Sequence, residues 1–447
     1  MTTSAVSLVL EQLVAEIRSG QRPPGSLLPT HRQLAARHGI AIASASKVYA
    51  QLQSMGLAIG ETGRGTFVRD RPPQREWDRG DEARLDSGTV DLSFNHPCWP
   101  GQGQLLREML RALAASGEVA ALMHQQPPGG RHHERAIVAA FLREERGIAA
   151  DATTVLLVNG AQHGLDAVTR ALLGPRDAVA VDALTYPGFR MLAEVQRLAL
   201  HPVPVGIQGP DLDALEALCR RRRIRAIYTL PTLHNPLGWV LDLDIRRALV
   251  AIARRHDCLL IEDAAYAWLA THAPPPLLTL APERTVYVGS LSKSLASGLR
   301  FGFVVVPDAL ATRVKATLRA SGWSLPSVIT AMATRWIADG TVARQEAAMR
   351  GDGRRRQAIA RKALAGLQCI AHPAAPFLWL PLPDELRMDR IATALAARGI
   401  AVSKGEAYAT TRHAPHALRL ALGSPPIAQL PSVLEQVRDT IERFPIA

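Results

Sequence analysis

Residues 289–303 read GSLSKSLASGLRFGF, and this stretch decides the fold predicted for most of the chain. It follows the apolar run 285–288, whose composition is typical of a buried strand. Lys293 therefore lies just past a strand end, among serines, and it is one of five lysines in 447 residues. A lysine amine can condense with an aldehyde to form a Schiff base if it is held near a cofactor and can lose its proton. Lys293 is the candidate reactive residue.

Polar residues suited to an aromatic ring follow two other predicted strands. Asn235 occurs in HNPLG after the apolar run 226–230, and Asp263 ends the run in LLIEDAAY, with Tyr266 one helical turn later. A carboxylate against a pyridine nitrogen keeps that nitrogen protonated and makes the ring an electron sink. Asn235 and Tyr266 could both hydrogen-bond a ring hydroxyl. Each position also has a simpler interpretation, since Asn235 could cap a turn and Asp263 could cap a helix.

Other groups suited to a phosphorylated ligand occur at strand ends as well. The sequence NGAQHGL follows an apolar strand, so its backbone amides would lie at a helix N-terminus, a ready phosphate site. Arg300 in GLRFGF offers a fixed charge for phosphate, and Tyr186 in TYPGF can stack on a ring. Arg419 in ALRLALG is placed to pair a carboxylate bidentately. Ligands of open α/β sheets bind at these strand ends.

The order of NPxG, D-x-x-Y after a strand, and SxSK resembles that of the fold type I aminotransferases over most of residues 92–447. The resemblance implies pyridoxal 5'-phosphate (PLP) as cofactor and Lys293 as its Schiff-base lysine. It implies Asp263 as partner of the pyridine nitrogen, Arg419 as carboxylate clamp and Tyr186 as the stacking aromatic. The remaining implied ligands are Asn235 and Tyr266 for the ring hydroxyl, and Gly160, Ala161, Gln162, Ser290, Ser292 and Arg300 for the phosphate.

The first 70 residues have a different texture. Apolar residues recur at helical spacing up to Gly20, and a second helix is predicted at residues 32–38, with a capping box of Thr30 and Gln33 and Gly39 at its end. A third helix is predicted at residues 43–55, followed by two short strands around a glycine-rich tip in LAIG-ETGRG-TFV. Three helices and a hairpin indicate a winged helix-turn-helix, whose third helix lies in the major groove of DNA.

This segment resembles the GntR family of bacterial regulators through PGSLLPTHRQLA, SKVYAQL and GLAIGETGRGTFV. The resemblance implies phosphate contacts from Arg32 and Lys47, base or phosphate contacts from Ser44 and Ser46, and a minor-groove role for Arg64. One departure is that Ala41-Ile42 replaces the Ser-Arg usual at the start of the recognition helix. Two alternatives stay open: the segment could be a dimerisation or adaptor module without DNA binding, and Ser44 and Ser46 could be plain surface residues.

The predicted domains are a winged helix-turn-helix over residues 1–70, a polar, proline-containing linker over 71–91, and an α/β domain over 92–447. The expected fold class is α/β, with a large, mainly parallel sheet and a smaller C-terminal α+β subdomain from about residue 345. The predicted strands are Val155–Val158, Val179–Val181, Ala226–Leu230, Cys258–Ile261, Thr285–Val288 and Phe301–Val306, with helices Leu212–Arg222 and Leu243–His256 between them.

Composition narrows the class of protein further. No apolar run approaches the roughly 20 residues of a membrane span, and the N-terminus has no secretory leader, so we expect a cytoplasmic protein. The net charge of +12 permits a nucleic-acid partner without establishing one. The four cysteines have no paired spacing, and no carboxylate lies at ligand spacing from His132-His133 or from His96, so no metal site is expected. The segment FNHPCWP, residues 94–100, is a candidate for lining a substrate entrance instead.

A GntR-type winged helix joined to an aminotransferase-like domain is the architecture of the MocR-type regulators. The resemblance implies a PLP-dependent transcription regulator that binds double-stranded promoter DNA and senses an amino compound or PLP through Schiff-base chemistry at Lys293. It also implies a head-to-tail homodimer with each winged helix near the large domain of the other chain. Two alternatives remain: an active aminotransferase with an accessory N-terminal domain, and a degenerate domain that only dimerises.

Overall fold

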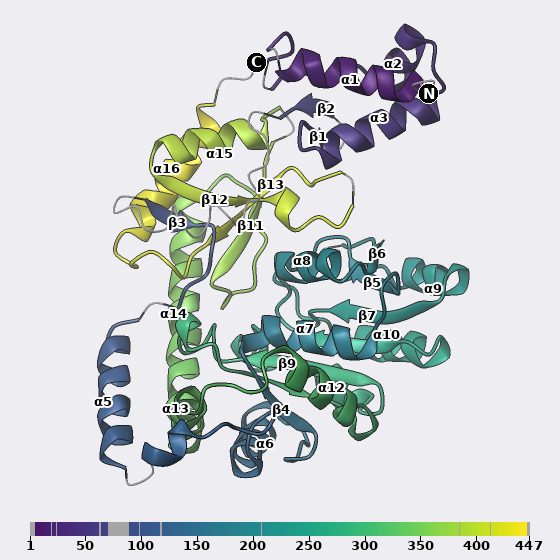
Figure 1. The fold of residues 1–447 in the computed structure, drawn as a ribbon. Helices are drawn as coiled ribbons and strands as arrows, with labels where there is room; N and C mark the ends of the chain where they lie inside the picture. Colours follow the sequence, from purple (N-terminus) through teal and green to yellow (C-terminus); the bar gives the residue numbers. More distant parts are fainter. Residues whose placement is uncertain are drawn as a thin grey trace.

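The computed structural model describes residues 5–18, 20–23, 25–61, 64–69, 89–97, 99–116, 119–206, 208–383, 385–411 and 413–444 (Figure 1). The predicted linker lies outside these residues as far as residue 88, and so does Cys98. Among the described residues, no helix is both long and apolar enough to cross a bilayer.

The N-terminal unit is the predicted winged helix. Helices α1 (Ala5–Arg18), α2 (His31–His38) and α3 (Ile42–Ser54) precede strands β1 (Ala58–Glu61) and β2 (Gly65–Val68), which pair antiparallel. The predicted capping box is confirmed, because the Thr30 hydroxyl accepts from the Gln33 amide and the Gln33 side chain accepts from the Thr30 amide. Gly39 ends α2 at a φ of 62°. Leu13, Leu34 and Leu52 are buried at the centre of this unit.

The large unit is a seven-stranded sheet with strand order β4-β10-β9-β8-β7-β5-β6. Strand β10 is antiparallel to both neighbours, and the other pairs are parallel. The six predicted strands are confirmed within two residues at each end, whereas β6 was not predicted. The strands are β4 (Val155–Val158), β5 (Ala178–Asp182), β6 (Ala199–Val203), β7 (Ile224–Thr229), β8 (Leu259–Asp263), β9 (Thr285–Ser290) and β10 (Gly302–Val305).

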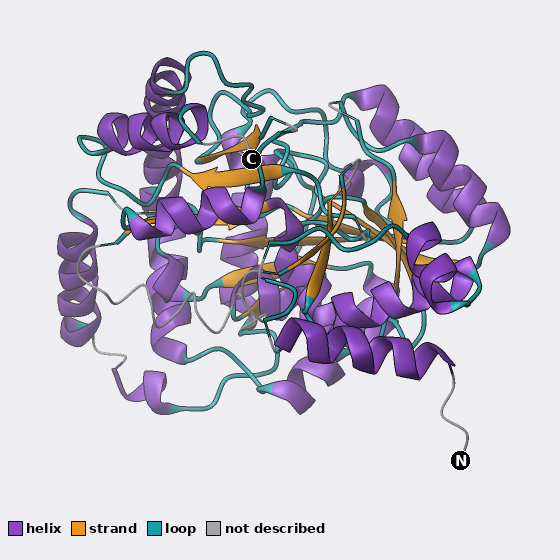
Figure 2. Cartoon of the chain, turned by 90° about the horizontal axis from the view of Figure 1, so that it is seen from above, coloured by secondary structure: helices purple, strands orange, loops and turns teal. Residues whose placement is uncertain are grey.

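Helices cover both faces of this sheet, as Figure 2 shows. Helices α7 (Gly160–Leu172), α8 (Pro187–Val195) and α12 (Asp308–Ser321) bury their apolar sides on one face. The other face is covered by α6 (His132–Arg146), α13 (Ser327–Ala338), α9 (Leu212–Arg221), α10 (Leu243–Arg255) and α11 (Leu277–Leu280). Because both faces are buried, the central residues of β4, β9 and β10 are apolar without alternation.

The C-terminal subdomain begins at the long helix α14 (Thr341–Ala363), which runs from the large unit to the small sheet in Figure 1. That sheet has the order β11-β13-β12-β3, from β11 (Phe377–Pro381), β13 (Ala417–Ala421), β12 (Ile400–Lys404) and β3 (Val90–Leu92). Helices α15 (Met388–Ala397) and α16 (Leu430–Glu442) cover it. Because β3 pairs in parallel with β12, residues 90–92 belong to this subdomain although they precede the large sheet in sequence.

The wing, which comprises β1, β2 and the adjoining residues Arg64 and Arg69, packs on this subdomain. Ile59 and Phe67 belong to the same buried cluster as Leu386 and Met388. The guanidinium of Arg387 lies 4.5 Å from the centre of the Phe67 ring. The two units are therefore in contact within one chain, which the sequence did not indicate.

Candidate cofactor site and nucleic-acid interface

Lys293 lies in the turn after β9, at the edge of the sheet where the parallel strands end. Its Nζ donates to the Asn95 carbonyl at 2.8 Å and lies 4.1 Å from the centre of the Phe94 ring. Phe94 and Asn95 come from the FNHPCWP segment, so the structure brings that segment to the predicted reactive lysine.

Asp263 ends β8 as a carboxylate that is 2% exposed. It accepts hydrogen bonds from the Tyr228 hydroxyl at 2.8 Å and from the Ala265 amide at 3.0 Å. Burial raises the pKa of Asp263, and these hydrogen bonds act against that rise. No lysine or arginine among the described residues forms an ion pair with it. A buried carboxylate in this state suits a ligand that brings its own cation, such as a protonated pyridine nitrogen.

Tyr228 was not predicted from the sequence. Its ring stacks on Phe189, with ring centroids 3.6 Å apart and an angle of 4° between the planes, and this contact holds the hydroxyl in place below Asp263. Burial and the neighbouring carboxylate keep the pKa of Tyr228 well above its ordinary value, so it remains a donor. A strand tyrosine that meets a carboxylate on the next strand has no sequence signature, because the contact spans 35 positions.

Asn235, Tyr266 and Tyr186 lie in the segments that follow β7, β8 and β5, at the same edge of the sheet as Asp263. The Asn235 Oδ1 atom is buried and has no hydrogen-bond partner among the described residues. Burial raises the pKa of Tyr266 and of Tyr186, so both remain neutral hydroxyls. Gly188 allows Tyr186 to approach, since a Cβ at that glycine would lie 2.5 Å from the tyrosine ring.

Gly160, Arg300 and Ser292 meet at the start of α7. A Cβ on Gly160, whose φ is +78°, would lie 3.0 Å from Arg300 Nη2 and 3.5 Å from Ser292 Oγ. Arg300 itself adopts a φ of 51° and donates to the Asn159 carbonyl at 3.3 Å. Ser292 Oγ and Gln162 Oε1 are buried without partners among the described residues. A helix N-terminus with an arginine and unpaired polar groups suits a phosphate.

The residues predicted for PLP thus follow the ends of strands of one sheet, and Asn235 Oδ1, Ser292 Oγ and Gln162 Oε1 are atoms of the kind that its ring and phosphate would pair. Asp263 could face the ring nitrogen, Asn235 the ring hydroxyl, and Ser292 and Arg300 the phosphate. Ser290 ends β9 and is buried, next to this group. Ala161 follows Gly160 in the first turn of α7.

Arg419 is 3% exposed on β13, where its guanidinium lies 4.6 Å from the centre of the Phe377 ring. Its Nη1 donates to the Ser93 carbonyl at 3.3 Å, and Nη2 faces the Asn95 side chain. With its amide oxygen toward this pair, Asn95 also accepts from the Tyr266 hydroxyl at 3.1 Å, and its nitrogen donates to the Pro376 carbonyl at 2.7 Å. Asn95 therefore links Arg419 to the ring-side tyrosine. A bound carboxylate would compete with Asn95 for Arg419.

A second unpredicted group supports the loop that carries Asn235. Arg246 is fully buried and donates to the carbonyls of Pro231 at 3.0 Å and Leu241 at 2.9 Å, at the two ends of this loop. His234 stacks on Trp239 at 3.7 Å, and its Nε2 lies 3.5 Å from the Asp182 carboxylate. In sequence, Arg246 looks like one more surface arginine of an amphipathic helix, so only its burial reveals its role.

The predicted DNA contacts divide into two sets. Arg32 and Lys47 are exposed on α2 and α3, and Ser44 and Ser46 are half-buried on α3. Arg64, in contrast, donates to the carbonyls of Leu386 at 2.6 Å and Glu385 at 3.4 Å in the C-terminal subdomain. Insertion of Arg64 into a minor groove would therefore require the wing to leave that subdomain.

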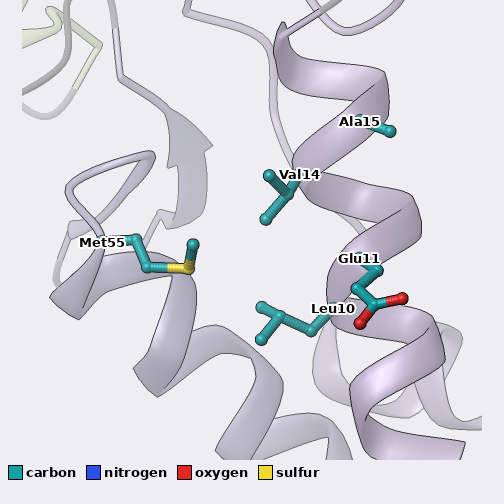
Figure 3. A pocket seen from close by; sticks show the side chains of 5 residues that line it. All are labelled: Leu10, Glu11, Val14, Ala15 and Met55. Atoms are coloured by element: carbon teal, nitrogen blue, oxygen red, sulfur yellow. The ribbon is translucent and has the colours of Figure 1, made fainter. Parts of the chain in front are cut away.

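A shallow apolar hollow lies between α1 and the far end of α3. Leu10 and Val14 of α1 point toward Met55, with Glu11 and Ala15 at its rim (Figure 3). Met55 follows the last residue of α3, so the hollow is at the opposite end of that helix from its first turn. It contains none of the predicted cofactor or DNA contacts.

Comparisons with known proteins agree with both halves of the chain. The family described as "Aminotransferase class I and II" matches residues 87–437, and "Bacterial regulatory proteins, gntR family" matches residues 6–68. The chain is 29% identical to the HTH-type transcriptional regulator TauR of Rhodobacter capsulatus over 89% of its length and 88% of that protein. It is 27% identical to the HTH-type pyridoxine biosynthesis transcriptional regulator PdxR of Corynebacterium glutamicum, over 98% and 96%.

Solved structures share the fold of the larger part. An archaeal alanine:glyoxylate aminotransferase superposes with a TM-score of 0.76 at 22% identity, covering 82% of this chain and 94% of that one. The α-aminoadipate aminotransferase LysN of Thermus thermophilus gives a TM-score of 0.72 at 23% identity, over 80% and 94%. The chain therefore belongs to the aminotransferase class I and II family, and its fused GntR domain makes it a MocR-type transcription regulator.

Proposed function

We propose that this regulator binds promoter DNA through its winged helix and senses an amino compound, or PLP itself, through Lys293. The observation that carries the proposal is the set of buried polar atoms without partners among the described residues, Asn235 Oδ1, Ser292 Oγ and Gln162 Oε1, around Asp263 and Lys293. Leaving such atoms unpaired costs about 1–3 kcal/mol each, so their convergence favours a ligand that pairs them.

When bound, PLP supplies an aldehyde that condenses with primary amines and a pyridine ring that accepts electrons. The chain's own groups would set the conditions for that chemistry. Tyr228 holds Asp263 toward the ring nitrogen, and Asn235 offers an oxygen to the ring hydroxyl. Asn95 accepts from the Lys293 amine through its carbonyl and meets Arg419 through its side chain, so it touches both groups that an amino acid would engage.

A short series of contacts joins this site to the wing and supports a sensing role. Helix α8 begins directly after Tyr186, and its Arg190 donates to the carbonyls of Glu406 at 3.0 Å and Ala407 at 2.5 Å. The Glu406 carboxylate forms an ion pair with Arg69 at the end of the wing. A shift of α8 on ligand binding would thus be transmitted to the wing through the turn that contains Glu406 and Ala407. The docked and released wing would be the two states that the ligand biases.

Exposed apolar side chains support a homodimer. Leu106 and Leu110 on α5 (Gln102–Ala115) are 43% and 46% exposed, and Val119 and Met123 of the following turn are 46% and 86% exposed. Large apolar side chains exposed to this extent are typical of an interface. A second copy of this chain is the proposed occupant, in the head-to-tail arrangement that the MocR resemblance implies.

The near-visible absorption of the purified protein with added PLP tests the sensing proposal. We expect a band in the wild type that is absent in Lys293→Ala and retained in Lys362→Ala, a matched control because Lys362 is exposed on α14. A panel of amino acids and amines is then added, with retention of promoter DNA assayed in parallel. A compound that shifts the band and changes DNA retention supports the proposal. A band that is the same in Lys293→Ala contradicts it.

An active aminotransferase is the second candidate, because the groups that transamination requires are all present in the site. It predicts steady conversion of the bound cofactor to its amine form by an amino acid, together with DNA binding that is absent or indifferent to that amino acid. The same titration separates the two functions, since a regulator couples the spectral change to DNA retention.

A further inference from the structure

The first turn of α3 presents an apolar surface to solvent. Ile42 is 53% exposed, and its neighbours Ala41 and Ala43 are exposed as well. The core of the winged helix is made further along the same helix, by Ala45, Val48, Tyr49 and Leu52. Ile42 is therefore not part of the buried core of this domain.

The same turn has little capacity for hydrogen bonding. Ala41 precedes the helix without a side-chain cap, and the Ser46 hydroxyl donates back to the Ile42 carbonyl at 3.1 Å. Between residues 41 and 43, the side chains offer methyl groups and no donor or acceptor. An arginine that could read guanine bidentately is missing from this surface.

The charges around this turn indicate what covers it. Arg32 and Lys47 are exposed on α2 and α3, and their positive charges suit the phosphate groups of DNA. In a helix-turn-helix, the N-terminal residues of the second helix contact base edges. The apolar group on the major-groove edge of DNA is the C5 methyl of thymine.

We propose that Ile42 is a specificity-determining residue that packs on a thymine methyl group in each half-site of the operator. The inference rests on the DNA binding proposed above and adds the chemistry of the base that is read. Because burial of one methyl group is worth about 0.8 kcal/mol, we expect about a fourfold preference for each thymine contacted. DNA is a better occupant than a second protein, since the exposed basic residues Arg32 and Lys47 lie on the same two helices of the motif.

Replacement of thymine by deoxyuridine tests this directly, because it removes the methyl group and leaves the base pair unchanged. Duplexes are first selected from a random pool by the full-length protein with PLP. Each thymine of the selected site is then replaced in turn, and affinity is measured by fluorescence anisotropy at fixed salt. We expect one thymine per half-site whose replacement weakens binding about fourfold.

Variants assign the effect to the side chain. In Ile42→Ala the ratio of thymine to deoxyuridine affinities should fall toward one, and in Leu8→Ala it should stay at the wild-type value. Leu8 is a matched control because it is 56% exposed on α1 of the same domain. Thermal unfolding of each variant checks that the domain is intact.

Two results would overturn the inference by different routes. If duplexes bind but deoxyuridine has no effect, or if its effect persists in Ile42→Ala, then Ile42 does not contact a thymine methyl group. Either result leaves the proposed DNA binding intact. Failure of the wild type to retain any duplex from the pool refutes the DNA-binding function itself.

Discussion

Replacing Arg387 by methionine should release the wing from the C-terminal subdomain. Arg387 is 9% exposed, donates to the Gly25 carbonyl and lies 4.5 Å from the centre of the Phe67 ring. Methionine keeps much of the volume and removes the charge and the donor. The substitution therefore removes at least these two contacts between the units, while the apolar packing of Ile59 and Phe67 on the subdomain stays in place.

The size of the effect follows from those two contacts. A hydrogen bond from a charged donor contributes about 1.5–3 kcal/mol, and a cation–π contact about 0.5–2 kcal/mol. Since the two share one side chain and are not additive, docking should weaken by about 2–4 kcal/mol. This corresponds to about 30-fold to 900-fold in the ratio of docked to released wing. Apparent DNA affinity should rise by that factor until the released form predominates.

Fluorescence anisotropy with a labelled duplex measures the affinity, and hydrogen exchange of residues 57–69 measures docking. We expect tighter DNA binding and faster exchange in Arg387→Met. Arg390→Met is the matched control, because Arg390 is exposed on α15, three residues after Arg387, and its guanidinium faces Phe444 rather than the wing. Faster exchange with unchanged DNA affinity would refute the idea that docking competes with DNA. Unchanged exchange would refute the strength assigned to the contacts.

Three further perturbations follow from the structure. Gly160→Ala should weaken PLP binding by about tenfold, the equivalent of one lost hydrogen bond, because the added Cβ would lie 3.0 Å from Arg300 Nη2 and 3.5 Å from Ser292 Oγ and would displace these expected phosphate ligands. Gly147→Ala is the matched control, because Gly147 also has a positive φ, +63°, but nothing within 4 Å, and it should leave PLP binding unchanged in the same fluorescence titration. Tyr228→Phe should raise the pKa of Asp263 further, because it removes a hydrogen bond that lowers this pKa. A carboxyl pKa that folding raises lowers the stability once the pH exceeds the unfolded value near 4, so the melting temperature of the cofactor-free variant should fall more at pH 8 than at pH 4. An equal fall at both pH values would contradict the argument. Met123→Glu should shift the protein toward monomer in light scattering, and an unchanged mass would remove that patch from the dimer interface.

The sequence by itself predicted six of the seven strands of the large sheet and the residues expected to bind the cofactor. Lys293, Asp263 and Gly160 each follow a short apolar strand, and parallel strands of one sheet end at one edge, so local pattern was enough to place them together. The winged helix was equally local, because its caps, turns and helix lengths depend on residues a few positions apart.

Only the tertiary structure decided which distant groups meet. Tyr228 below Asp263, Asn95 between Tyr266 and Arg419, and β3 beside β12 join residues separated by 35 to more than 300 positions. The engagement of Arg64 with the carbonyl of Leu386 spans 322 positions. Such contacts depend on how whole units pack, and no periodicity or motif in a single chain records them.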